Sequence, residues 1–147
     1  MNTDLSFAQD EDAVRRAWPV FAQLRPHIGD AEELVRRWRR QQSEGYRLVL
    51  ARPEGSPTVL GAAGFRLLTT MAWGRVLYLD DLIVDEASRG TGLGGQLLDF
   101  VKAVAGSEEC DQVHLDTGYH RHAAHNTYLR AGFRFNCHHL ALPLKEA

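Results

Sequence analysis

The chain has little cysteine and no long hydrophobic run. Its 147 residues hold two cysteines, Cys110 and Cys137, too few and too unpatterned for a disulfide scaffold or a zinc knuckle. No apolar stretch is long enough to span a bilayer, and the N-terminus lacks the charged-then-apolar pattern of a signal peptide. The formal net charge of −2 gives no reason to expect nucleic acid or an anionic membrane as a partner. We therefore expect a cytoplasmic protein that binds neither.

Several catalytic signatures are also missing. There is no Gly-x-x-x-x-Gly-Lys-Ser/Thr sequence, so a P-loop NTPase is not supported. Histidines crowd the C-terminal third, but no His-Glu-x-x-His or Cys-x-x-Cys set accompanies them, so we predict no metal site. No linker or internal repeat divides the chain, which predicts a single domain over residues 1–147.

The hydrophobic pattern predicts a mixed α/β order of elements. Two N-terminal helices are expected first, with Pro19 kinking or dividing the earlier one. Strands, a helix, a further strand and a last helix should follow, with two short strands closing the chain. The expected helices cover 10–24, 30–45, the stretch after the glycines to about 105, and 122–131; the expected strands cover 46–52, 58–68, 75–84, 112–117, 133–135 and 139–142.

A glycine-rich turn joins the apolar strand that ends at Val84 to the helix that begins near Leu93. Glycines allow close approach of a ligand, and the first N–H groups of a helix have no internal acceptor, so such a turn is suited to a phosphate. The turn also reads as Gly90-x-Gly92-x-x-Gly95, the dinucleotide fingerprint. However, residues 85–88 separate the strand from the glycines, whereas a dinucleotide site places them directly after the strand.

Two segments together resemble the GNAT superfamily of N-acetyltransferases. Arg89-x-x-Gly92-x-Gly94 matches the family's Arg/Gln-x-x-Gly-x-Gly/Ala signature, and residues 124–133 resemble its Ala-x-x-x-Tyr-x-x-x-Gly-Phe segment. The resemblance implies an α/β fold with a mixed, mostly antiparallel sheet, two splayed parallel strands and helices on both faces. It also implies acetyl-CoA as cosubstrate, with its pyrophosphate on the loop amides and its pantetheine arm in the gap between the splayed strands.

The resemblance carries over onto particular cofactor-binding residues. Three come from the strand end, seven from the glycine turn and two from the last helix: Leu82, Ile83, Val84, Arg89, Gly90, Thr91, Gly92, Leu93, Gly94, Gly95, Asn126 and Tyr128. One departure stands out, because many members have asparagine seven residues before the tyrosine, where this chain has Arg121. The contact of that asparagine with the cofactor arm is then either lost, supplied by Asn126, or replaced by an arginine contact to phosphate or substrate.

Acetyl transfer to an amine needs a proton acceptor, N–H donors for the oxyanion and an acid for the leaving thiolate. The resemblance makes Tyr128 the acid and the Val84 amide an oxyanion donor. Three carboxylates are candidates for the base, since charges in or beside apolar strands are costly unless paired or placed in a cleft; they are Asp80, Asp81 and Asp116. Strand alternation puts the first two on opposite faces unless a bulge intervenes.

The same carboxylates suggest a small cationic acceptor such as a polyamine, an aminoglycoside or an amino-acid derivative. We expect His120, Arg121 and His122 to border the acceptor site. In this family the N-terminal helices often form a wall of that site, so the resemblance also implies that Arg36 or Trp38 contacts the substrate. We therefore predict direct transfer of an acetyl group to a primary amine in a ternary complex, by an enzyme that can form a homodimer. The alternative is a module that binds or senses acyl-CoA with little turnover.

Overall fold

The computed structural model describes residues 2–145, which fall into two compact units. The first unit ends at Leu115 and the second begins at Asp116. Each unit is described by itself, and the single domain expected over 1–147 stays a prediction.

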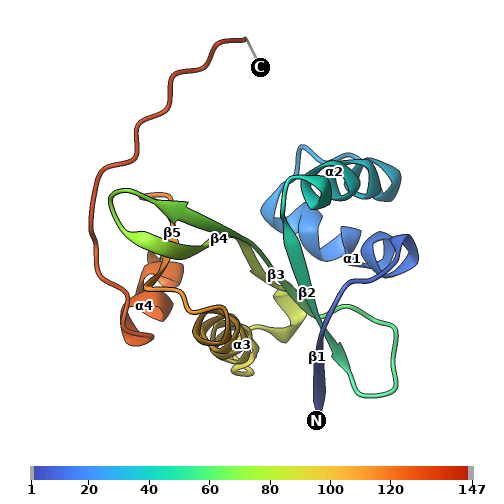
Figure 1. The fold of residues 1–147 in the computed structure, drawn as a ribbon. Coiled ribbons are helices and arrows are strands. Elements are labelled where there is room, and N and C mark those ends of the chain that lie inside the picture. Colours follow the sequence, from blue (N-terminus) through green and yellow to red (C-terminus); the bar gives the residue numbers. More distant parts are fainter. Residues whose placement is uncertain (1, 146–147) are drawn as a thin grey trace. The chain divides into compact units, whose positions relative to one another are not determined.

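The first unit is built on a five-stranded sheet in the order β1-β2-β3-β4-β5 (Figure 1). Its strands are β1 (Thr3–Phe7), β2 (Arg47–Pro53), β3 (Gly61–Thr70), β4 (Gly74–Val84) and β5 (Gln112–Leu115). Neighbouring strands are antiparallel except β4 and β5, which are parallel. The mixed, mostly antiparallel sheet is thereby confirmed, and it differs from the parallel sheet that a dinucleotide-binding fold requires.

Helices cover both faces of this sheet. Figure 1 shows α1 (Glu11–Leu24) and α2 (Ala31–Ser43) on one face and α3 (Leu93–Ser107) on the other. Aspartates begin the first two helices: Asp10 accepts a hydrogen bond from Ala13 N, and Asp30 accepts one from Glu33 N, each at 2.8 Å. Such caps satisfy N–H groups that the first turn leaves without partners.

The structure corrects two points about the N-terminal region. Pro19 does not divide α1, which runs as one helix because buried side chains on both sides of the proline anchor it to the core; the alternative, a kink at Pro19, stays a prediction. A strand, β1, precedes the helices. It is a short edge strand with polar residues at Asp4 and Ser6, so its own sequence carries little apolar signal.

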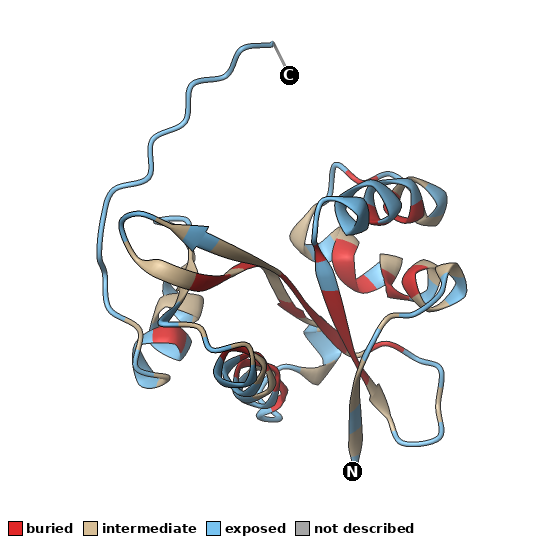
Figure 2. Cartoon of the chain, viewed as in Figure 1, coloured by how far each residue is buried: buried red, intermediate tan, exposed pale blue. Residues whose placement is uncertain are grey.

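The core lies on both faces of the sheet (Figure 2). Successive buried residues of β2 belong to different faces of the sheet. Leu48 and Leu50 belong to the cluster that packs against α1 and α2, while Val49, which is also buried, lies between them in sequence. Successive side chains of a strand point to opposite faces, so Val49 faces the α3 side. On that side α3 buries Leu93, Leu97, Leu98 and Val101, as its helical periodicity predicted, together with Ala105, whereas Val104 of the same predicted face is only half-buried.

The second unit contains α4 (His122–Arg130), close to the helix expected over 122–131. The two closing strands, 133–135 and 139–142, are absent, because residues 133–145 form no strand. Their apolar alternation was read correctly, but a strand also needs a neighbour for its N–H and C=O groups, and no ladder includes this segment. Leucines are left highly exposed along it: Leu140, Leu142 and Leu144.

Candidate active site

The glycine turn has the backbone that its sequence predicts. After β4 a short 3₁₀ helix, Glu86–Ser88, leads into Gly90 and Gly92, whose φ angles are +80° and +85°. These left-handed conformations favour glycine because a Cβ would be strained there. Gly92 is the N-cap of α3.

The turn presents donors to open space. The first hydrogen bond of α3 runs from Gln96 N to Gly92 O, so the N–H groups of residues 93–95 precede the helical ladder. A Cβ placed on Gly90, Gly92 or Gly95 would meet no atom within 4 Å. Aligned donors, a helix N-terminus and free space above the backbone fit the diphosphate of a nucleotide cosubstrate.

Side-chain hydrogen bonds hold the turn in place. Thr91 Oγ1 donates to Ser88 O at 2.6 Å, and Arg89 Nε contacts Val84 O at 3.4 Å. Gln23, near the end of α1, accepts from Glu86 N at 3.0 Å and donates to Asp85 at 2.7 Å. These contacts tie the turn to α1 and to β4. Sequence reasoning missed Gln23, because nothing in its local pattern marks a partner 62 residues away.

The strand that leads into the turn outlasts its parallel neighbour. The β4–β5 register ends at the pair Leu79 and Leu115, whereas the β3–β4 register continues to the pair Gly61 and Val84. Residues 80–84 therefore have no strand partner on the β5 side within the part of the chain that the structure describes. An extended ligand can receive backbone hydrogen bonds at such an edge, as an added strand would.

Asp81 lies at the centre of a polar cluster on the α1–α2 side of β4. Its Oδ2 accepts a hydrogen bond from the Tyr46 hydroxyl at 2.7 Å, and its Oδ1 accepts one from Arg25 Nε at 3.1 Å. Arg25, which follows α1, also donates to Asp80 O at 3.0 Å. Burial, followed by the Asp81 carboxylate, raises the pKa of Tyr46 well above its ordinary value, so this hydroxyl stays a donor.

Asp80 has a different partner. The β3–β4 register passes from Leu79 to Asp81 across Gly64 and Phe65, which leaves Asp80 as the extra residue of a β-bulge. Its carboxylate accepts two hydrogen bonds from Arg66, at 2.7 and 2.8 Å. The bulge interrupts the alternation that would place the two aspartates on opposite faces, as bulges commonly re-aim side chains beside active sites.

Gly64 makes room for the Asp81 cluster. An ideal Cβ on Gly64 would lie 1.6 Å from the Tyr46 hydroxyl oxygen. This glycine is therefore required by close approach and not by its backbone angles. The sequence alone offered no reason to single out Gly64, Tyr46 or Arg25.

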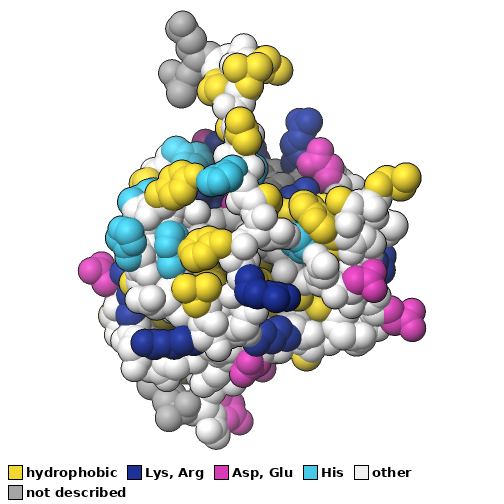
Figure 3. Space-filling model, turned by 90° about the vertical axis from the view of Figure 1, so that its left-hand side faces the viewer, with side chains coloured by type: hydrophobic (Ala, Val, Ile, Leu, Met, Phe, Trp, Pro, Cys, Tyr) yellow, Lys and Arg dark blue, Asp and Glu magenta, His cyan; other side chains and the backbone are white. Residues whose placement is uncertain are grey.

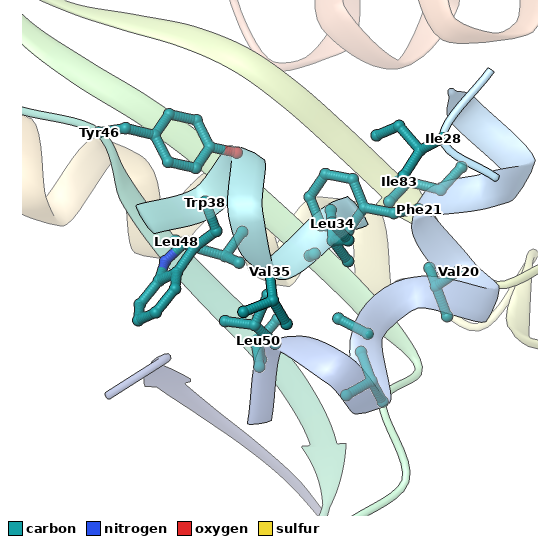
Figure 4. Packing of buried hydrophobic residues seen from close by; sticks show 14 residues of the cluster. Val20, Phe21, Ile28, Leu34, Val35, Trp38, Tyr46, Leu48, Leu50 and Ile83 are labelled. Atoms are coloured by element: carbon teal, nitrogen blue, oxygen red, sulfur yellow. The ribbon is translucent and has the colours of Figure 1, made fainter. Parts of the chain in front are cut away.

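A cavity of about 140 Å³ opens beside this cluster, between the two N-terminal helices and the sheet. Figure 4 shows the core residues around it. Its apolar walls are Phe21, Ile28, Leu34, Trp38 and Leu48, and Tyr46 and Asp81 are among its polar residues. Trp38 was one of the residues expected to wall an acceptor site, whereas Arg36 does not line the cavity.

The remaining predicted residues belong to the second unit. Tyr128 is 8% exposed and packs edge-to-face on Phe133, with ring centroids 5.8 Å apart. Burial raises the pKa of Tyr128, while Arg121 acts in the opposite sense. Asp116 Oδ1 lies 3.3 Å from His139 Nδ1. The predicted meeting of Tyr128 and Asp116 with β4 stays a prediction.

The other residues expected at the acceptor site lie around the start of α4. Arg121 is its N-cap residue, and His120, His122 and Asn126 are exposed. Figure 3 shows histidine and hydrophobic side chains mixed on the face that it presents. Over residues 2–145, no three His, Cys, Asp or Glu side chains gather as metal ligands would. In the same range no helix has both the length and the apolar character of a membrane span.

Solved structures share this fold at low sequence identity. An acetyltransferase from Trypanosoma brucei has a TM-score of 0.81 at 20% identity, over 97% of this chain and all of that one. Glucosamine-6-phosphate N-acetyltransferase from Arabidopsis thaliana gives 0.77 at 17%, over 99% of this chain and 100% of that one. An aminoglycoside N-acetyltransferase in complex with CoA gives 0.78 at 16%, over 99% and 96%.

The match at the level of sequence families is more specific than these likenesses of fold. Residues 11–133 match the model of the acetyltransferase (GNAT) family. This range includes the unpaired end of β4, the glycine turn and Tyr128. The chain therefore belongs to the GNAT acetyltransferase family.

Proposed function

We propose that the protein is an acetyl-CoA-dependent N-acetyltransferase that transfers an acetyl group to a primary amine by direct attack in a ternary complex. One observation carries the proposal: the unpaired end of β4 is followed, after the short 3₁₀ helix Glu86–Ser88, by a glycine turn with open space around Gly90, Gly92 and Gly95 at the start of α3. A strand edge followed by an anion-binding turn suits a ligand with an extended amide arm and a diphosphate.

In this proposal the chain binds acetyl-CoA, which supplies the thioester acyl group, with residues from three places. Backbone groups of Leu82, Ile83 and Val84 hold the pantetheine arm, and Arg89–Gly95 holds the diphosphate. Asn126 and Tyr128 complete the site from α4. The Val84 amide would also stabilise the negative charge that develops on the thioester oxygen.

Proton transfers are assigned to two kinds of side chain. Tyr128 donates a proton to the leaving sulfur, and its raised pKa means that the hydroxyl carries this proton near neutral pH. Asp81 is the preferred acceptor of the amine proton, directly or through water, since it lines the cavity while Asp80 is held by both Arg66 nitrogens. Asp116 is the alternative base, with His120, Arg121 and His122 bordering the acceptor.

We also propose that the protein works in the cytoplasm and forms a homodimer. The homodimer is supported by three leucines that are more than 80% exposed, Leu140, Leu142 and Leu144, since exposed apolar side chains gathered in one place commonly mark an interface. Light scattering coupled to size-exclusion chromatography tests it, and a monomer at high concentration would contradict it.

The transferase is tested in two steps. Calorimetry with acetyl-CoA should show binding at one site per chain, and release of free thiol should then follow on addition of a panel of primary amines. Binding without thiol release from any amine would instead favour an acyl-CoA-binding or sensing module. One observation supports this alternative: both aspartates of β4 are paired with arginines.

A further inference from the structure

The cavity beside Asp81 has a charge balance that the β4 aspartates alone do not indicate. Its polar lining consists of Arg25, His27, Arg37, Gln41, Tyr46 and Asp81. Asp81 contributes the one carboxylate of this lining and is already paired with Arg25, at 3.0 Å between Nη2 and Oδ1. Two guanidinium groups therefore face one carboxylate.

Arg37 is the cation that the cavity leaves least compensated. Its Nη2 lies 3.8 Å from Glu33 Oε1, which is beyond hydrogen-bond distance. Glu33 itself accepts a 2.8 Å hydrogen bond from Gly29 N through its other oxygen. His27 and Gln41, both exposed, line the cavity with Arg37. Such a group of donors suits a ligand anion, since hydrogen bonds to charged acceptors are the stronger ones.

The walls opposite these donors are apolar and partly aromatic. Phe21 and Trp38 are both nearly fully buried, at 4% and 6% exposure, and together with Ile28 they line the cavity. Its volume of about 140 Å³ is close to that of a cavity of roughly 150 Å³ known to accept benzene. The cavity therefore has room for one small apolar group.

We infer that the acceptor is an amino carboxylate with an apolar side chain, such as an aromatic or branched amino acid. Its carboxylate pairs with Arg37, its side chain packs on Trp38 and Phe21, and its amine lies at the Asp81 end, next to Leu82 on β4. This inference rests on the proposed transferase function. It selects the amino-acid derivative among the acceptors considered and disfavours a polyamine, whose charges would meet two arginines.

The test compares two amines that differ in one group. L-Phenylalanine and phenethylamine share the ring and the amine, but phenethylamine lacks the carboxylate. We expect kcat/KM for phenylalanine to exceed that for phenethylamine by about tenfold or more, as one charge-assisted contact allows. Arg37→Gln should remove this preference by lowering kcat/KM for phenylalanine far more than kcat/KM for phenethylamine. Arg36→Gln, on the same helix but outside the cavity lining, is the matched control and should retain the preference.

A binding measurement separates this inference from the transferase itself. Without any thioester, phenylalanine should raise the melting temperature of the wild-type protein and of Arg36→Gln, but not of Arg37→Gln. Equal turnover of both amines, a preference for spermidine or for glucosamine 6-phosphate, or an equal loss for both amines in Arg37→Gln would overturn the inference while leaving the transferase intact. Failure of the wild-type protein to bind acetyl-CoA would overturn the transferase and the inference with it.

Discussion

The Tyr46 hydroxyl donates a 2.7 Å hydrogen bond to Asp81, joining the first residue after the α2–β2 turn to the middle of β4. Tyr46 is 4% exposed. The Asp81 side chain is 12% exposed, and a carboxylate withdrawn this far from water needs donors, which this hydroxyl and the Arg25 guanidinium supply. The pair therefore connects core stability with the position of the proposed base.

Replacing Tyr46 by phenylalanine should destabilise the fold. The variant keeps the ring but leaves the Asp81 carboxylate short of a donor, at a cost of about 1–3 kcal/mol in the free energy of unfolding. Urea denaturation measures the loss. Tyr119→Phe, at a tyrosine that is 81% exposed, is the control and should change stability little. Equal stability of the Tyr46→Phe and wild-type proteins would show that the bond is unimportant.

Stability should also fall at alkaline pH. The pKa of Tyr46 lies well above its ordinary value of 10.0 in the folded protein, so above pH 10 the unfolded chain loses a proton that the folded chain keeps. The contribution of this tyrosine is thus fully present below pH 10 and is lost as the pH rises toward its folded-state pKa. The urea midpoint of the wild-type protein should drop between pH 9 and 11, and it should drop less in Tyr46→Phe.

Gly64→Ala should disturb the same cluster from the neighbouring strand. The new Cβ would fall 1.6 Å from the tyrosine oxygen and 2.2 Å from its ring carbon, so Tyr46 must move and the core must repack. We expect a loss of about 2–3 kcal/mol, within the range for an overpacked core. In a double-mutant cycle, Gly64→Ala should cost less stability in the Tyr46→Ala background than in the wild-type protein. Gly106→Ala, in α3 with open space around it, should be neutral or stabilising.

Gly92→Ala should weaken acetyl-CoA binding more than it weakens the fold. Its left-handed φ of +85° costs a residue with a Cβ about 1–2 kcal/mol, and relaxation of the turn would turn the N–H groups away from the diphosphate. Calorimetry should show Kd rising about tenfold. Gly106→Ala in the same helix is again the control. An unchanged Kd would place the diphosphate elsewhere.

Tyr128→Phe should separate chemistry from binding. Loss of the proposed general acid should lower kcat by about 10²-fold or more, while Kd for acetyl-CoA changes little. A poor leaving thiolate depends on this proton most, so acyl donors whose thiols have lower pKa values should be affected least. Turnover that survives the substitution would remove Tyr128 from the catalytic role.

The sequence predicted what local patterns determine. Helical periodicity located α3, Asp30 marked the start of α2, and the glycines after β4 indicated an open turn, in which Gly90 and Gly92 adopt positive φ. The parts that depend on distant partners were missed. Tyr46, Arg25 and Gly64 carry no local signal, because their roles arise only when β2, α1 and β3 come together beside Asp81.

The two predicted closing strands show that a local pattern can also mislead. Residues 133–142 have an apolar pattern that is typical of strands, but pairing is a property of two segments and not of one. The bulge at Asp80 likewise depends on the β3–β4 register. It overrode the simple alternation of faces that the adjacent aspartates suggested.

The most direct test of the central claim is an amide-resolved NMR titration of the protein with CoA. The account predicts that resonances of residues 82–84 and 90–95 shift together and saturate at one equivalent, while those of β1 and β2 stay in place. Saturation with no change at these two segments would contradict it, because the diphosphate and the pantetheine arm would then bind elsewhere or not at all.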